Sequence, residues 1–186
     1  MPRRFIARVS RPATLLSGAA LALALLAVVL ATVVRASASS ASAASALVGR
    51  PLPQVSLPAE WGGQPHGTRP LHPRDARPAL VLFVYSLCPR CSAEAVTASA
   101  LARQHGLDLV VVDSPAETPA IADAYAARLG LSGPILLDHS GALAARLGIG
   151  AYPALLLVDA RGIVREVWIG ETSQHSINAA IAGLAP

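Results

Sequence analysis

The pattern of hydrophobic and polar positions divides the chain into three parts. Residues 12–34 include no charged side chain, and 14–34 consist almost entirely of Leu, Ala and Val. Residues 36–46 contain only Ala and Ser, a composition typical of a flexible linker. From residue 47 onward, short apolar runs alternate with stretches of helical character. The pattern therefore predicts an N-terminal transmembrane segment, a linker and one α/β domain at 47–186.

This domain is predicted to contain strands that alternate with helices. The strands are expected at 52–57, 79–85, 107–113, 135–138, 154–159 and 163–169. The helices are expected from the cysteine pair to about 105, from Pro119 after an N-cap at Thr118, over 142–147, and from an N-cap at Ser173 to about 184. Residues 61–78 are rich in Gly, Pro, His and Arg and are predicted to be a loop. The alternation indicates a mostly parallel sheet flanked by helices, which the final hairpin at 160–162 makes mixed.

The apolar N-terminal segment has the length and the flanking charges of a membrane anchor. About 20 such residues span a hydrocarbon core, whereas a usual signal peptide has an apolar core of roughly 7–15 residues. Four arginines precede the segment and Arg35 follows it, so the positive-inside rule places the N-terminus in the cytoplasm. We therefore expect residues 1–35 to be an uncleaved signal anchor in a bacterial cytoplasmic membrane, with a single transmembrane helix at about 14–34.

A cleaved signal peptide remains the alternative for the same segment. Residues 36–38 and 44–46 both read Ala-Ser-Ala and resemble small-residue cleavage sites. Under either interpretation the C-terminal domain is extracytoplasmic.

The charge distribution argues against a nucleic-acid partner. The net charge is +4, but five of the 15 arginines flank the apolar segment, and all 11 carboxylates lie after it. The remainder of the chain therefore has ten arginines and 11 carboxylates, which gives a net charge of −1, and it has no basic stripe. A nucleic-acid-binding domain normally shows such a stripe, so we expect no nucleic-acid binding.

The only two cysteines form a Cys-x-x-Cys motif directly after an apolar strand and at the start of a helix. At a helix N-terminus the free amides and the helix dipole favour a thiolate, so Cys88 is the expected nucleophile. Pro89 suits the first helical turn, and Arg90 adds a positive charge nearby. The spacing brings Cys91 under Cys88, so Cys91 can resolve a mixed disulfide. The motif predicts a redox-active Cys88–Cys91 disulfide.

Other uses of the two cysteines fit the sequence less well. A structural zinc site needs four ligands, and the chain has no second cysteine pair. A structural disulfide across two intervening residues would join no distant parts of the chain. The histidines at 105, 139 and 175 stand singly in helical or loop contexts. We therefore expect no metal and no cofactor besides the disulfide.

Over about 47–184 the chain resembles the TlpA/ResA-like branch of the thioredoxin superfamily, the membrane-anchored thiol–disulfide oxidoreductases. The resemblance depends on the buried strand before Cys88-Pro-Arg-Cys91, the extra helix–strand unit at 118–138, and Tyr152-Pro153 before a strand. It implies a thioredoxin-like fold in which the proline at the Pro153 position is cis and packs against the disulfide. By the same resemblance, Tyr152, Pro153 and Arg90 border the groove that receives the substrate.

Members of this family often carry an acidic residue three positions after the second cysteine, and Glu94 matches that position. On a helix this spacing places Glu94 on the face of Cys91, where a partly buried carboxylate could relay a proton. A solvated glutamate near the start of the helix is the alternative.

The chain departs from the family pattern at several positions around the site. Leu87 replaces the usual Trp before the first cysteine, and Tyr152 and Ala154 replace the usual neighbours of the cis-proline. Leu82 occupies the position of thioredoxin's buried Asp, which leaves Glu94 as the only obvious acid near the cysteines. These departures affect the substrate surface and the redox potential.

The resemblance implies dithiol–disulfide exchange with secreted proteins and an electron donor or acceptor in the membrane. The family's best-known setting is cytochrome c maturation, in which the enzyme reduces apoprotein disulfides. Arg90 argues for the opposite direction, since stabilising the thiolate makes the disulfide a better oxidant. Two other functions remain open, a Cu(I) metallochaperone and a peroxiredoxin-type peroxidase, although the Thr-x-x-Cys arrangement of the latter is absent.

Overall fold

The structure is a computed structural model that describes residues 22–32, 45–72, 77–116 and 118–184. The chain divides into two units, Met1–Ala38 and Ser39–Pro186. The predicted transmembrane segment 14–34 and linker 36–46 lie partly outside the described residues, and the described part of the former, 22–32, is helical. Within the parts of the chain that the structure describes, no helix combines the length and hydropathy that a membrane crossing requires.

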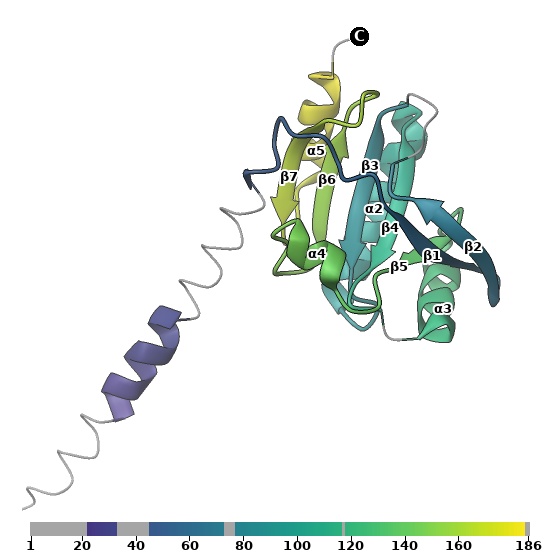
Figure 1. Ribbon diagram of the computed structural model, residues 1–186. Coiled ribbons are helices and arrows are strands. Elements are labelled where there is room, and N and C mark those ends of the chain that lie inside the picture. Colours follow the sequence, from purple (N-terminus) through teal and green to yellow (C-terminus); the bar gives the residue numbers. More distant parts are fainter. Residues whose placement is uncertain (1–21, 33–44, 73–76, 117, 185–186) are drawn as a thin grey trace, which may run out of the picture. The chain divides into compact units, whose positions relative to one another are not determined.

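From residue 79 onward, the second unit alternates strands and helices in the order expected from the sequence (Figure 1). Its strands are β1 (Ser56–Trp61), β2 (Gln64–Pro70), β3 (Ala79–Val84), β4 (Asp108–Asp113), β5 (Ile135–Leu137), β6 (Ala154–Val158) and β7 (Val164–Ile169). Its helices are α2 (Pro89–His105), α3 (Pro119–Leu129), α4 (Ala142–Arg146) and α5 (Gln174–Ala182). The expected N-caps are confirmed, because Thr118 Oγ1 accepts from Ile121 N at 3.3 Å and Ser173 Oγ from Ser176 N at 3.1 Å.

The seven strands form one mixed sheet in the order β2-β1-β5-β4-β3-β6-β7. β3, β4 and β5 are parallel, whereas β1 and β6 pair antiparallel to β5 and β3. The predicted α/β class with a mixed sheet is thus confirmed. β3 lies inside the sheet between β4 and β6, and the chain enters the Cys88 loop from the carboxyl end of this strand.

The N-terminal part of the domain differs from the prediction. The strand expected at 52–57 begins only at Ser56, and the loop expected at 61–78 contains the whole of β2. β1 and β2 form a hairpin whose two turn residues, Gly62 and Gly63, have φ of 61° and 72°. Two positive φ angles are what a two-residue type I′ turn requires. The hydrophobic pattern missed β2 because this strand lies at the sheet edge and is exposed along its whole length.

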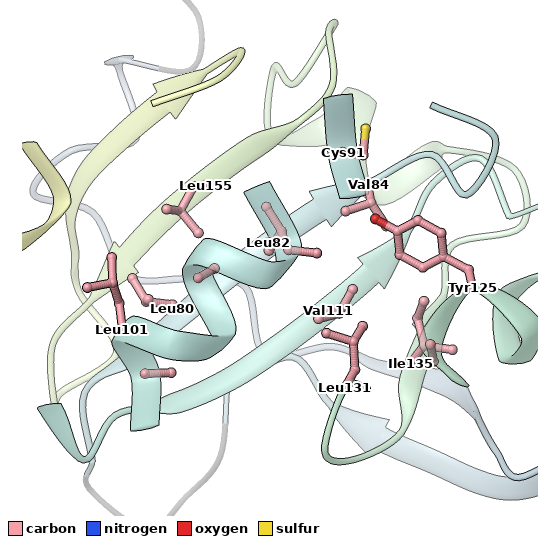
Figure 2. Packing of buried hydrophobic residues seen from close by; sticks show 14 of the residues in the cluster. Leu80, Leu82, Val84, Cys91, Leu101, Val111, Tyr125, Leu131, Ile135 and Leu155 are labelled. Carbon is pink, nitrogen blue, oxygen red and sulfur yellow. The ribbon is translucent and has the colours of Figure 1, made fainter. Parts of the chain in front are cut away.

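Two apolar clusters cover the two faces of the sheet. Successive residues of β3 point to opposite faces of the sheet. Leu80, Leu82 and Val84 belong to the cluster that includes residues of α2, α3 and α5. Val81 and Phe83 belong to the cluster that includes residues of α4. β3 and β6 are therefore buried on both faces, as their uninterrupted apolar sequences predict. Figure 2 shows the first cluster, in which Cys91 is one of the fully buried members.

The Asp159 carboxylate accepts several hydrogen bonds in the turn between β6 and β7. Asp159 Oδ1 accepts hydrogen bonds from Arg161 N and Ile163 N at 2.9 Å each, and Oδ2 accepts two from the Arg165 guanidinium at 2.9 and 2.6 Å. Burial raises the pKa of Asp159, but the bonds from Ile163 N–H, Arg165 and Arg161 N–H outweigh it, so the net shift is downward.

We expect Asp159→Asn to lower the free energy of unfolding by about 1–3 kcal/mol at pH 7, because hydrogen bonds to a charged group are lost. A depressed folded-state pKa stabilises the protein above the unfolded pKa of about 3.9, and this contribution disappears as the pH falls through the folded pKa. Urea unfolding at pH 7 and pH 3 measures the difference, which should shrink at pH 3. Asp108→Asn is the matched control, since the ion pair of Asp108 with exposed Arg77 is worth little. An equal decrease in the free energy of unfolding of the two variants at pH 7 would contradict the stabilising role of the Asp159 hydrogen bonds.

Candidate active site

The two cysteines lie at the point where the loop after β3 enters α2. Cys88 is the N-cap of α2 with extended backbone, φ −87° and ψ 115°, and its Sγ accepts from Cys91 N at 3.2 Å. Pro89 occupies the first turn, where its missing N–H leaves no helical bond unmade. Cys88 and Cys91 form the expected disulfide. Cys88 is partly exposed whereas Cys91 is completely buried, so only Cys88 is accessible to a second protein.

The residues beside Cys88 present an apolar and a cationic group to solvent. Leu87 is 58% exposed, which is unusual for a large aliphatic side chain in a folded domain. Arg90 is also exposed, one residue before Cys91. The surface around the accessible sulfur therefore combines a hydrophobic contact point with a positive charge.

Glu94 lies on α2 less than one turn beyond Cys91 and is only 3% exposed. The solvated alternative for this residue is therefore wrong. Its Oε2 accepts from Thr172 N at 3.2 Å, and its buried Oε1 has no hydrogen-bond partner among the described residues. Burial raises the pKa of Glu94, the bond from Thr172 N–H opposes this, and the nearby Glu171 carboxylate adds to the rise. A buried carboxyl with a raised pKa and one free oxygen is suited to exchange a proton with a neighbouring group.

The Tyr152–Pro153 peptide bond is cis, as the family resemblance implies. Pro153 directly precedes β6, whose first residue Ala154 pairs with Phe83 of β3. The chain thus brings Tyr152 and Pro153 to the end of the sheet from which the Cys88 loop emerges. Cys88 and Tyr152 both pack against the apolar cluster under α2. The structure therefore brings the sequence-predicted residues together at one end of the sheet.

Two buried acids at this end, Asp113 and Asp138, were not anticipated from the sequence. Asp113, the last residue of β4, is completely buried and its Oδ1 accepts from Ser86 N at 2.9 Å. Ser86 stands two residues before Cys88, so Asp113 fixes the start of the cysteine loop. A usable signal existed, because Asp113 and Asp138 each stand at the end of an apolar run, and parallel strands end at the same edge.

The histidines that the sequence left without a role are outside this arrangement. His105 Nε2 lies 2.8 Å from Asn178 Oδ1 at the far end of α2, and His139 and His175 are exposed. Among the described residues, no three His, Cys, Asp or Glu side chains gather as metal ligands would.

Comparisons with known proteins agree with this geometry. The profile of the redoxin family matches residues 47–182, and the chain belongs to this family. With its Cys88–Cys91 disulfide, the protein is a thiol–disulfide oxidoreductase of thioredoxin-like fold. No curated protein sequence matches the chain.

Three of the solved structures that match show the similarity of fold. A Chlorobium tepidum protein described as the thiol:disulfide interchange protein DsbE has a TM-score of 0.63 and 18% identity, over 74% of this chain and 96% of that one. A secreted Mycobacterium tuberculosis disulfide oxidoreductase homologous to DsbE has a TM-score of 0.57 and 23% identity, over 70% and 96%. The peroxidoxin BcpB of M. tuberculosis has a TM-score of 0.57 and 21% identity, over 74% and 95%. At these identities the likenesses show the fold.

Proposed function

We propose that the protein is an extracytoplasmic, membrane-anchored reductase of disulfides in secreted proteins, with cytochrome c apoproteins as one substrate class. The observation that carries the proposal is the contrast between partly exposed Cys88 and completely buried Cys91, with buried Glu94 less than one turn further along α2. The resemblance to TlpA/ResA-like proteins and the charge pattern around 14–34 support the location.

In the proposed reaction the reduced enzyme gives up two electrons and the substrate disulfide accepts them. The Cys88 thiolate attacks one sulfur of the substrate disulfide and forms a mixed disulfide, while the other substrate sulfur leaves as a thiolate and is protonated. Cys91 then transfers its proton to the Glu94 carboxylate and attacks Cys88 Sγ. This step closes the Cys88–Cys91 disulfide and releases the second substrate thiolate.

The remaining residues of the site shape the surface that the substrate meets. Tyr152 and cis-Pro153 border the groove beside the disulfide, and Leu87 and Arg90 flank its open side. A membrane protein that donates electrons would reduce the Cys88–Cys91 disulfide again after each turnover.

The reduction potential of the Cys88–Cys91 couple tests the direction of electron flow. We expect a value near that of thioredoxin, about −270 mV, because buried Glu94 disfavours a neighbouring thiolate and so favours the oxidised enzyme. Equilibration of the purified protein with glutathione or dithiothreitol buffers, read by thiol alkylation, gives this value. A potential near that of DsbA, about −120 mV, would show that Arg90 dominates and that the enzyme oxidises its substrates.

A further inference from the structure

Two buried polar side chains and a partly buried one form a hydrogen-bonded chain at the carboxyl end of the parallel strands. The Tyr152 hydroxyl donates to Ser114 Oγ at 3.3 Å, and the Ser114 hydroxyl donates to Asp138 Oδ2 at 2.8 Å. Ser114 and Asp138 are both buried. Neither residue contributes to the exchange chemistry described above, so their burial and mutual bonding require another explanation.

The Asp138 carboxylate also accepts two hydrogen bonds from backbone amides. Its Oδ1 accepts from Leu143 N at 3.3 Å, and its Oδ2 accepts from Ala144 N at 3.0 Å, both at the start of α4. A serine hydroxyl has a single proton, and Ser114 gives it to Asp138. The Ser114 oxygen can therefore only accept from Tyr152, which fixes the direction of every bond in the chain.

The chain of bonds ends at Tyr152, which packs against the same apolar cluster as Cys88. The β3–β6 register ends with the pair Phe83↔Ala154, so Tyr152 and the Cys88 loop lie beyond the same end of these two strands. Ser114 directly follows Asp113, the residue that holds Ser86 N. The backbone of Asp138 is bonded to the same strand end, since Asp138 N donates to Asp113 O at 3.0 Å. The orientation of Tyr152 is thus fixed by the same rigid strand ends that fix the cysteine loop.

Burial raises the pKa of the Tyr152 hydroxyl, which the bond to Ser114 partly offsets, so this hydroxyl remains a proton donor at neutral pH. While it donates to Ser114, the ring of Tyr152 is held in one orientation beside cis-Pro153. A loosely held ring would instead have to be ordered whenever a polypeptide docks, and that ordering costs binding free energy.

We propose that Ser114 and Asp138 are positioning residues for thiol–disulfide exchange with protein substrates, because they hold Tyr152 in place as a wall of the groove beside Pro153. This inference depends on the proposed function in one respect, that the substrate is a protein. A small disulfide needs to reach only Cys88 Sγ and gains nothing from an ordered wall. Loss of the bonded chain should therefore weaken docking of proteins and leave the sulfur chemistry unchanged.

The test compares Ser114→Ala, Tyr152→Phe and the double variant in the full chain. Steady-state reduction of insulin, with dithiothreitol as electron donor, gives KM and kcat, and the reaction of the reduced enzyme with oxidised glutathione gives a second-order rate constant. We expect KM for insulin to rise about fivefold in each single variant, with kcat and the glutathione rate constant within about twofold of wild type. Because both substitutions break the same bond, the double variant should be no worse than the more impaired single variant.

Ser99→Ala is the matched control, since it also removes a buried serine hydroxyl with a side-chain partner, Arg103, but two turns along α2 from Cys91. Its KM should equal that of wild type. An unchanged KM in a folded Tyr152→Phe protein, or strictly additive effects in the double variant, would overturn the inference, and Tyr152→Phe decides alone if Ser114→Ala does not fold. A parallel loss of the glutathione rate constant would also overturn it. A wild-type protein that reacts with glutathione but not with insulin would instead refute the proposed function, and the inference with it.

Discussion

In the Cys91→Ser variant, mixed disulfides between Cys88 and substrate proteins will accumulate, and turnover will fall by at least about a thousandfold. The reason is the unequal burial of the two sulfurs: Cys88 is partly exposed and Cys91 is completely buried. An external disulfide can reach only Cys88, and only Cys91 lies close enough to release the product. Non-reducing electrophoresis after acid quenching, followed by mass spectrometry of the linked peptide, measures the trapped species.

The Cys88→Ser variant provides the control for this assignment of roles. It should lose turnover to the same extent and should trap no substrate, because its remaining sulfur has no exposed surface. If Cys88→Ser traps substrate through Cys91 while Cys91→Ser does not, the nucleophile and the resolving thiol have been exchanged, and the burial argument fails.

The Glu94→Gln variant will resolve mixed disulfides about a hundredfold more slowly at pH 7, a typical effect of losing a positioned proton acceptor. In the wild-type protein the rate depends on ionised Glu94, so it should fall as the pH drops below the raised pKa of this carboxyl. In the variant the Cys91 thiol must ionise unaided, so its rate should rise with pH. The two rates should therefore converge in alkaline solution. Single-turnover release from a preformed mixed disulfide between pH 5 and pH 9 measures both profiles.

Stability distinguishes this proton transfer from damage to the fold. The raised pKa of Glu94 means that the folded state loses stability as the pH rises through that pKa, because a buried carboxylate must then be ionised. Glu94→Gln removes this penalty and should be at least as stable as wild type at pH 8. Glu171→Gln, which changes the neighbouring exposed carboxylate, should resolve normally. Equal pH profiles for Glu94→Gln and wild type would contradict the relay.

The sequence predicts well those elements whose position depends on burial of the whole element or on hydrogen bonds between neighbouring residues. β3 and β6 are continuous apolar runs because helices cover both faces of the central sheet. The helix boundaries at Thr118 and Ser173 follow from local hydrogen bonds that any such sequence can make. The hairpin of β1 and β2 could not be found in this way, because an edge strand that is exposed on both faces shows no alternation of hydrophobic and polar residues. Its one readable signal was Gly62-Gly63.

The same distinction applies to the site. The cysteine pair is local in sequence, so its position at the start of a helix was predictable. The bonds that join Ser114, Asp138 and Tyr152 connect residues up to 38 positions apart, and only the strand order brings them together. The burial of Glu94 likewise depends on the segment after β7, which supplies the amide of Thr172. Contacts between residues this far apart in the chain produce no recognisable pattern in the sequence.

The exposed edge of the sheet at β2 has a consequence for the proposed function, in which the substrates are incompletely folded polypeptides. Such chains carry unpaired backbone groups and readily add to the open edge of a sheet. β2 is poorly suited to accept them, because Pro65 and Pro70 have no amide hydrogen and Gly67, with φ of 68°, departs from strand geometry. The strand can therefore complete the sheet without becoming a site where client chains aggregate, even though every one of its residues is exposed.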